Sequence, residues 1–168
     1  PMSRRTVLVT DYAWPSLDVE REILAAADAD LLVAETGSEE ELVALAPQAD
    51  AILTNWRQVP PAALEAAPRC LVVSRFGVGV DNIPVARATA LGILVTNVPD
   101  FCLEEVSDHA MALLLALARK VPLSNKLVQS GRWEVPPIVP IHRLAGRVLG
   151  LVGLGNIPRA LAPKAKAF

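Results

Sequence analysis

The sequence predicts an α/β protein in which a parallel sheet is buried under helices. Through the first hundred residues, short aliphatic segments alternate with segments of helical periodicity, which is the arrangement of crossover-connected parallel strands. Apolar residues make up 52% of the 168 residues and aromatic residues only 4%, so the core must be built from aliphatic side chains. Aliphatic strands covered on both faces are typical of parallel sheets.

Five strands are expected, each a short run of aliphatic or β-branched residues, at 6–9, 31–33, 51–54, 71–74 and 93–96. Four helices should connect them, at 17–27, 38–46, 60–67 and 84–91. In the first helix, Leu17, Ile23-Leu24 and Ala27 share one face. Ser38 and Glu41 form a capping box for the second helix, and Gly92 ends the fourth.

The pattern changes after Pro99. A long helix is expected from Glu104 to Lys120, with acidic residues in its first turn and basic residues in its last, as the helix dipole favours. It is apolar almost all round, which predicts burial between domains or subunits. A further helix should end at Ser130, with Gly131 as its C′ residue. A strand at 148–152 and a helix reaching Phe168 complete the chain, and the predicted domains are 1–100 and 101–168.

Charge and hydropathy exclude several classes of partner. The net charge is −2 with both signs scattered, so no basic stripe indicates nucleic acid. The longest wholly apolar run, Ala110 to Ala118, is too short to span a bilayer, and the apolar run Val7 to Val9 is too short for a signal peptide. We interpret Cys70 and Cys102 as reduced thiols of a cytoplasmic protein, with a redox or metal pair as the alternative, and expect no metal site.

Gly153 and Gly155 lie between a predicted strand and a predicted helix, as in the start of a dinucleotide-binding fingerprint. The first glycine would make the tight turn, and the second would let the backbone approach a pyrophosphate at the helix N-terminus. A simple tight turn is the alternative. Pro158 replaces the third glycine, and Pro163 falls inside the helix, where proline costs about 3 kcal/mol.

A second glycine loop, Gly77-Val78-Gly79, follows the fourth strand. Ligands of open parallel sheets bind beyond the carboxyl ends of the strands, where Asp11, Thr54-Asn55 and the segment 75–79 should converge. Successive glycine-loop amides can hold an anion, and Arg75 can add a positive charge. Taken alone, the loop would be interpreted as a tight turn beside a solvated arginine.

Four segments in this order and spacing resemble the D-isomer-specific 2-hydroxyacid dehydrogenases, a family that includes phosphoglycerate dehydrogenase. The similarity extends from about Ala51 to Phe168. The segments are Arg75-Phe76-Gly77-Val78-Gly79-Val80-Asp81-Asn82-Ile83, Val95-Thr96-Asn97-Val98-Pro99, Glu104-Glu105-Val106-Ser107-Asp108-His109 and Leu149-Gly150-Leu151-Val152-Gly153-Leu154-Gly155.

The resemblance implies a flavodoxin-like substrate domain, residues 1–100, followed by the truncated start of a Rossmann domain, residues 101–168. It implies NAD as cofactor and a small 2-hydroxy or 2-keto acid as substrate. The substrate residues would be Asn55, Arg75, Gly77, Val78 and Gly79. The cofactor residues would be Val78, Val106, Gly153, Gly155, Asn156 and Ile157.

The family's catalytic arginine, glutamate and histidine follow later in the Rossmann domain, so no catalytic residue is assigned to this chain. His109 and His142 do not match the motif of the catalytic histidine and are interpreted as structural or surface residues. Three hypotheses stay open: part of a dehydrogenase without turnover of its own, an acid-binding or regulatory module, and a structural partner completed by another chain. A homo-oligomer is expected.

Overall fold

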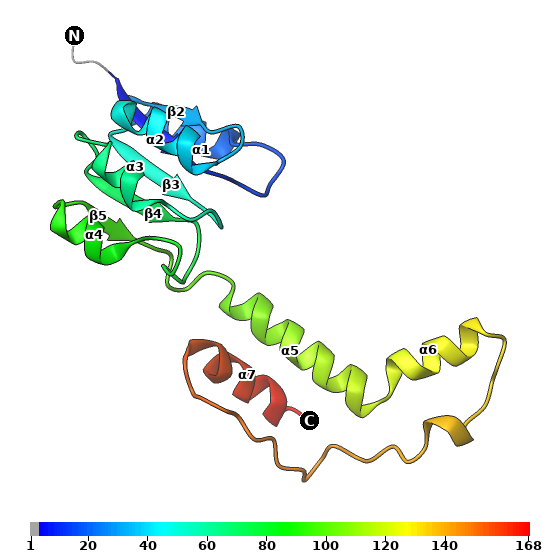
Figure 1. The fold of residues 1–168 in the computed structure, drawn as a ribbon. Helices are drawn as coiled ribbons and strands as arrows, with labels where there is room; N and C mark the ends of the chain where they lie inside the picture. Colours follow the sequence, from blue (N-terminus) through cyan, green and yellow to red (C-terminus); the bar gives the residue numbers. More distant parts are fainter. Residues whose placement is uncertain (1–3) are drawn as a thin grey trace. The chain divides into compact units, whose positions relative to one another are not determined.

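The computed structural model describes residues 4–168, which form two compact units divided between Phe101 and Cys102 (Figure 1). The first unit is a five-stranded sheet with all neighbours parallel and the strand order β2-β1-β3-β4-β5. This is the flavodoxin-like order, in which the chain reverses direction across the sheet beside β1. The strands are β1 (Arg5–Val9), β2 (Ala29–Val33), β3 (Ala51–Thr54), β4 (Val72–Arg75) and β5 (Leu94–Thr96).

All five predicted strands are present, and none of their ends is displaced by more than two residues. The four predicted helices are also present, and the second continues into a short 3-10 turn, η1 (Ala46–Gln48). The helices are α1 (Asp18–Ala25), α2 (Glu39–Leu45), α3 (Pro61–Glu65) and α4 (Val85–Ala90). The prediction of an α/β fold is therefore confirmed.

The main core lies on the face of the sheet covered by α2, α3 and α4, which pack side by side. Leu8, Ile52 and Val73 point into it from three neighbouring strands and are almost completely buried. Right-handed crossovers place α1 on the opposite face. The predicted apolar face of α1 is only partly correct: Leu17 is buried, but Ile23 is 65% exposed, because this helix lies against little more than β2.

The predicted capping box of α2 is confirmed in a larger form. The Ser38 hydroxyl accepts a hydrogen bond from the Glu41 N–H, and the Glu41 carboxylate accepts from the N–H groups of Glu35, Thr36 and Gly37 and from the Thr36 hydroxyl. The Thr36 hydroxyl is the largest of the contacts that lower the pKa of Glu41 to about 2. The cap thus fixes the loop between β2 and α2.

The second unit is helical. It contains α5 (Leu103–Ala118), α6 (Val121–Gln129), a 3-10 turn η2 (Pro136–Ile138) and α7 (Asn156–Lys166). Gly131 follows α6 with a φ of +76°, as predicted for a C′ residue. No helix among the described residues is long and apolar enough to cross a membrane.

Lys164 joins α7 to the first turns of α5. Its Nζ lies 2.7 Å from Glu104 Oε2 and 2.6 Å from the hydroxyl of the fully buried Ser107, and it also contacts Asp108. Its hydrogen bonds with Asp108 and then Glu104 raise the pKa of Lys164. This contact holds the two helices together although Pro163, one residue earlier, interrupts the hydrogen bonding of α7 without ending the helix.

The predicted strand at 148–152 is wrong. The segment forms no strand, and its backbone groups make no hydrogen bond within the described part of the chain. Val148 and Val152 are almost fully exposed. A parallel strand exists only with a neighbour to share its ladder, and the second unit supplies none.

Amide hydrogen exchange should be slower in the central strands of the sheet than in residues 148–154. We expect slow exchange at Val7 to Val9, Ile52-Leu53 and Val73, which lie in the middle of the sheet, and fast exchange at residues 148–154, whose amides have no acceptor in the described structure. Native-state exchange followed by NMR would measure this. Slow exchange throughout 148–154 in a monomer verified by light scattering would contradict the expectation.

Candidate functional site

The carboxyl ends of β1 and β3 are joined by the side chain of Asp11. Its Oδ1 accepts from the Asn55 N–H at 2.9 Å and its Oδ2 from the Trp56 N–H at 2.8 Å. The Thr10 hydroxyl donates to Oδ1 at 2.8 Å. These contacts lie at the carboxyl ends of β1 and β3, between which the order of the strands reverses. Open parallel sheets bind ligands at such a point.

The charge of Asp11 is stabilised by its donors. Burial of the carboxylate raises the pKa, but the N–H groups of Trp56 and Asn55, the Thr10 hydroxyl and the Arg57 N–H together outweigh burial and hold the pKa of Asp11 below its ordinary value of 3.8. The carboxylate therefore stays ionised and keeps its four acceptor positions available for these donors.

The predicted convergence at this edge is confirmed for Asn55, Arg75 and the glycine loop. Arg75 Nε donates to the Asn55 carbonyl at 3.0 Å, and Arg75 Nη1 donates to the Gly79 carbonyl at 2.7 Å. Asn82 Nδ2 donates to carbonyls of the same region at 2.8 Å (Arg57) and 3.3 Å (Asn55). Arg75 thus holds the loop, and its guanidinium, with five N–H groups in all, keeps capacity for an anion.

The loop Gly77-Val78-Gly79 turns its carbonyls toward the protein. The Gly77 carbonyl accepts from the Val98 N–H at 2.9 Å, the Val78 carbonyl from Asn97 Nδ2 at 2.6 Å, and the Gly79 carbonyl from Arg75. The three amide N–H groups of the loop donate no hydrogen bond within the described residues. Three neighbouring donors without an acceptor are an arrangement that can hold a carboxylate.

Both glycines lie close to the Arg75 guanidinium. A Cβ at Gly77 would lie 3.2 Å from the guanidinium carbon, and a Cβ at Gly79 would lie 3.4 Å from Nη1 and 3.2 Å from Asp81 Oδ2. Alanine at position 77 would therefore require the Arg75 guanidinium to move by a few tenths of an ångström. Val78, between them, is 44% exposed.

The second glycine loop lies in the other unit. Gly153 has a φ of +88°, which fits the tight turn predicted for it, and Gly155 is the N-cap residue of α7. A Cβ at either glycine would meet open space. Asn156 and Ile157 form the first turn of α7, but Pro158 has no N–H, so this helix start offers one donor fewer to a pyrophosphate. Val106, the remaining predicted cofactor residue, is 43% exposed on α5.

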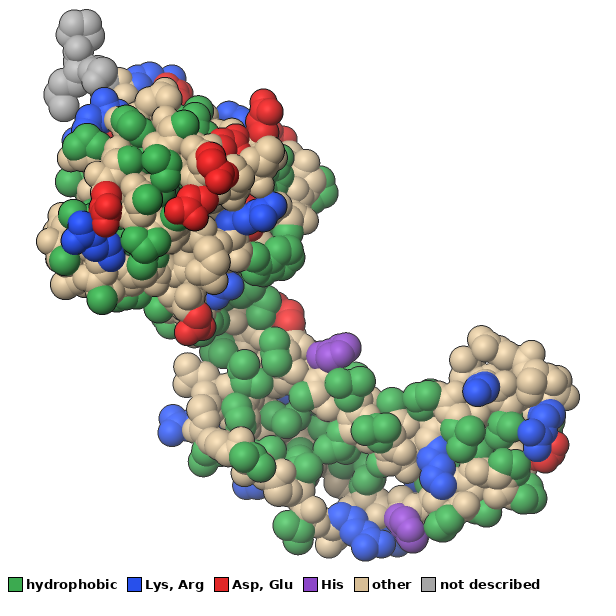
Figure 2. All heavy atoms as spheres, in the orientation of Figure 1, with side chains coloured by type: hydrophobic (Ala, Val, Ile, Leu, Met, Phe, Trp, Pro, Cys, Tyr) green, Lys and Arg blue, Asp and Glu red, His purple; other side chains and the backbone are tan. Residues whose placement is uncertain are grey.

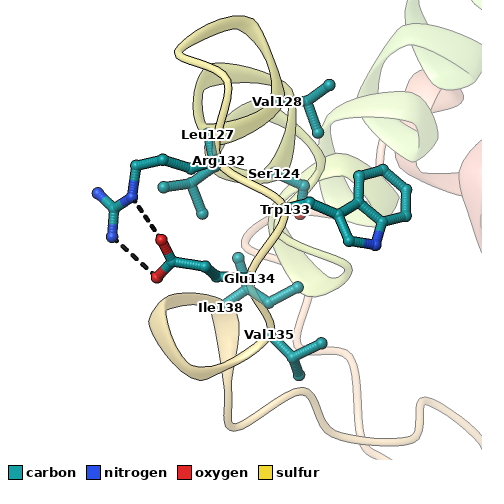
Figure 3. A pocket seen from close by; sticks show the side chains of 8 residues that line it. All are labelled: Ser124, Leu127, Val128, Arg132, Trp133, Glu134, Val135 and Ile138. Carbon is teal, nitrogen blue, oxygen red and sulfur yellow. Dashed lines mark hydrogen bonds and ion pairs between the residues drawn. The ribbon is translucent and has the colours of Figure 1, made fainter.

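A different cavity, of about 180 Å³, lies between α6 and the segment that follows it (Figure 3). Its apolar lining residues are Leu127, Val128, Trp133, Val135 and Ile138, and Arg132 and Glu134 form a bidentate ion pair at 2.9 and 3.0 Å. None of the predicted site residues contributes to it. Because its two charges neutralise one another, it is a poor site for an acid.

Sequence reasoning misses one contributor to the loop, Asn97, and the structural role of Asp11. Asn97 lies in one of the segments that resemble the family, and no role is predicted for it, yet its side-chain amide donates to the Val78 carbonyl. Asp11 was placed at the correct edge, but its part in joining two strands needs the strand order, which the residues alone do not reveal. His109 and His142 do not belong to this cluster, and within residues 4–168 no group of three metal-ligating side chains gathers. Cys70 and Cys102 are both free thiols.

Comparison with known proteins defines the class. The sequence profile of the D-isomer specific 2-hydroxyacid dehydrogenase catalytic domain matches residues 7–162, so the chain belongs to this family. It is 40% identical to a glyoxylate reductase of Pyrococcus furiosus over 136 residues, which are 77% of this chain and 40% of that protein. It is 34% identical to the D-3-phosphoglycerate dehydrogenase of Mycobacterium tuberculosis over 99% of this chain and 31% of that one.

Solved structures of related dehydrogenases have the same fold as this chain. An NADPH-dependent glyoxylate/hydroxypyruvate reductase of Sinorhizobium meliloti, solved with citrate, superposes with a TM-score of 0.81 at 34% identity, covering 99% of this chain and 51% of that one. A D-lactate dehydrogenase of Aquifex aeolicus, solved with NAD and lactic acid, has the same fold with a TM-score of 0.78 at 24% identity. The chain spans about a third to a half of the length of these relatives.

The Asp11 contacts can be tested by substitution. Asp11→Asn should destabilise the first unit by about 2 kcal/mol at neutral pH, because hydrogen bonds to a charged acceptor are lost. Since the folded-state pKa of Asp11 is lowered, its contribution is present above the ordinary value of 3.8 and is lost as the pH falls through the folded pKa. The difference between variant and wild type, measured by urea unfolding, should therefore shrink in acid.

Asp100→Asn is the matched control, because Asp100 is exposed and takes part in none of these contacts. Equal unfolding midpoints for Asp11→Asn and Asp100→Asn at neutral pH would show that Asp11 does not hold the two strand ends together.

Proposed function

We propose that this chain supplies the acid-binding side of a D-2-hydroxyacid dehydrogenase together with the start of its nicotinamide dinucleotide site. The observation that carries the proposal is the loop 77–79: its three carbonyls accept hydrogen bonds from the protein, and its three amides donate none within residues 4–168. A substrate carboxylate would accept from these amides, and the positive charge of Arg75 would favour it. Asn55 would line the same pocket.

The proposed substrate is a small 2-hydroxy or 2-keto acid, in keeping with the glyoxylate and phosphoglycerate named for the relatives. The bound dinucleotide would supply the hydride that passes to or from substrate C2. This chain's residues would bind and orient it: Gly153 and Gly155 with Asn156 and Ile157 would hold the pyrophosphate, and Val78 and Val106 would contact the cofactor. We assign no proton transfer to His109 or His142.

Both NADP and NAD complexes occur among the solved relatives, and we propose NAD for this chain on the family resemblance alone. Residues 1–100 would form the substrate domain and 101–168 the beginning of the dinucleotide domain. We further propose that the protein is cytoplasmic. We also propose that it forms a homo-oligomer, since α5 and α6 leave many apolar side chains exposed.

Acid binding can be tested without turnover. Oxalate, a dicarboxylate of the size of a small 2-keto acid, should shift the NMR amide signals of Gly77, Val78 and Gly79, with a dissociation constant of about 1 mM for a site with so few donors. Oxamide has the same shape without the charge and should bind much more weakly.

Gly77→Ala should weaken oxalate binding, because its Cβ lies 3.2 Å from the Arg75 guanidinium and requires that side chain to move, whereas Gly150→Ala, at a position with open space for a Cβ, should leave binding unchanged. Equal binding of oxalate and oxamide, or shifts spread over the whole sheet, would refute the acid site.

Cofactor binding should be limited by two prolines. Pro158 removes a donor from the first turn of α7, and Pro163 removes a hydrogen bond within the helix. Calorimetric titration of the chain with NAD should therefore give weak or undetectable binding, and the double variant Pro158→Gly/Pro163→Ala should bind more tightly. A micromolar dissociation constant for the unmodified chain would contradict this prediction.

A further inference from the structure

The carboxyl edge of the sheet carries most of the aromatic residues of this chain. The sequence has seven aromatic residues, and five of them follow the ends of strands in the first unit. These five are Tyr12 and Trp14 after β1, Trp56 after β3, Phe76 after β4 and Phe101 after β5. Within the described residues, no side chain of the main core is aromatic. The largest apolar side chains are therefore concentrated where the sheet binds ligands and not where it packs.

Three of the five line one groove, which we call the aromatic groove. It has a volume of about 380 Å³ and lies between the first turn of α1 and the segments that follow β4 and β5. Its lining residues include Trp14, Val19, Glu20, Phe76, Val98 and Phe101. All of them belong to the first unit. A volume of this size lies within the range of small-molecule sites.

Ring packing fixes part of the wall of the aromatic groove. The Trp14 and Phe76 rings are edge to face, with centroids 4.9 Å apart at 81°, and the Tyr12 ring lies beside Trp14 with centroids 6.0 Å apart. Phe101 is 52% exposed and Val98 41%. Figure 2 shows that hydrophobic side chains reach the surface of the first unit. An apolar groove open to water is the kind of surface that a ligand covers.

The aromatic groove and the loop 77–79 share their backbone. Phe76 immediately precedes Gly77, and the Val98 N–H donates to the Gly77 carbonyl at 2.9 Å. Asn97, which precedes Val98, donates to the Val78 carbonyl at 2.6 Å. Because consecutive Cα atoms are only about 3.8 Å apart, an acid held by the loop amides needs a substituent of only a few bonds to reach the groove.

The lining of the aromatic groove selects the kind of substituent. Glu20 is its one charged residue, and no Lys or Arg of the described chain lines it. A phosphate or a second carboxylate would meet no cation there and would be repelled by Glu20. Glyoxylate, which has no substituent, would leave the groove in water. A planar apolar ring would cover the exposed side chains, and aromatic pairs are stabilised beyond the area that they bury.

We propose that the aromatic groove holds an aromatic ring carried on C3 of the substrate, which is then an aryl-substituted 2-keto or 2-hydroxy acid of the arylpyruvate and aryllactate class. This inference rests on the acid site proposed for loop 77–79 and concerns the part of the substrate that the loop does not contact. The carboxylate accepts from the loop amides, and the ring covers Phe76, Val98 and Phe101. These side chains determine specificity and take no part in the hydride transfer.

NMR titration of the 168-residue chain with two stable acids tests the proposal. D-lactate and D-3-phenyllactate differ only by the ring, and both should shift the amide signals of Gly77, Val78 and Gly79. Phenyllactate should also shift the indole N–H signal of Trp14 and bind about tenfold to a hundredfold more tightly, as expected for burial of a phenyl group. D-3-phosphoglycerate should bind no more tightly than lactate.

The results distinguish this inference from the proposed function. If the two lactates bind equally tightly at loop 77–79 and the Trp14 signal does not move, the acid site stands and the aromatic groove is not the site of the substituent. If neither acid shifts the loop amides, the proposed function fails and this inference fails with it.

Removal of one aromatic ring gives a second test. Phe101→Ala should weaken phenyllactate binding about fivefold or more and leave lactate binding unchanged, because only the first ligand carries a ring into the groove. Phe168→Ala is the matched control, since Phe168 is 54% exposed and lies outside the groove. Circular dichroism confirms that both variants remain folded. A loss of the same factor for both acids in Phe101→Ala overturns the proposal.

An added cation should change the preference of the groove. Val19 is 67% exposed, so Val19→Lys is tolerated by the fold. At low salt this variant should bind D-3-phosphoglycerate about two- to fivefold more tightly than wild type and phenyllactate more weakly. Leu117→Lys adds the same charge at a position of α5 that is 74% exposed and should change neither. Equal effects of the two lysines would place the substituent outside the aromatic groove and overturn the proposal.

Discussion

The carboxylate of Asp11 is the contact on which the candidate site depends. Asp11 follows β1, which lies between β2 and β3 in the sheet. Its carboxylate accepts hydrogen bonds from the backbone where β3 ends. With that backbone fixed, the Asn55 carbonyl receives Arg75, and Arg75 in turn holds the Gly79 carbonyl. One ionised side chain at the end of β1 is thus connected, through two further residues, to the loop that we propose binds the acid.

The parts of the fold that the sequence predicts well are those governed by local pattern. Strands such as Ala51–Thr54 are short aliphatic runs between polar turns, and the residues that end helices act on their immediate neighbours. The convergence of Asn55, Arg75 and the glycine loop also follows from the sequence, because the ends of parallel strands must meet at one edge. Their functional roles rest on the family resemblance and remain proposals.

The predictions that are wrong or incomplete share a different cause. Each concerns a residue whose structure depends on contacts with parts of the chain distant in sequence. Residues 148–152 have the composition of a strand, but a strand needs a neighbour, and the second unit offers none. Ile23 has the spacing of a buried residue on a helix that has little to pack against. Asn97 fixes a loop nineteen positions earlier in the chain, which no local pattern encodes.

The loop 77–79 is anchored at each of its three carbonyls, by a backbone N–H, a side-chain amide and a guanidinium. An anion arriving there would meet donors that already point in fixed directions, so little conformational entropy would be lost on binding. Recognition of the carboxylate then requires no closing movement within the loop itself. Any slow step that accompanies binding must arise elsewhere in the protein, and the arrival of the acid at this edge can be as fast as diffusion and orientation allow.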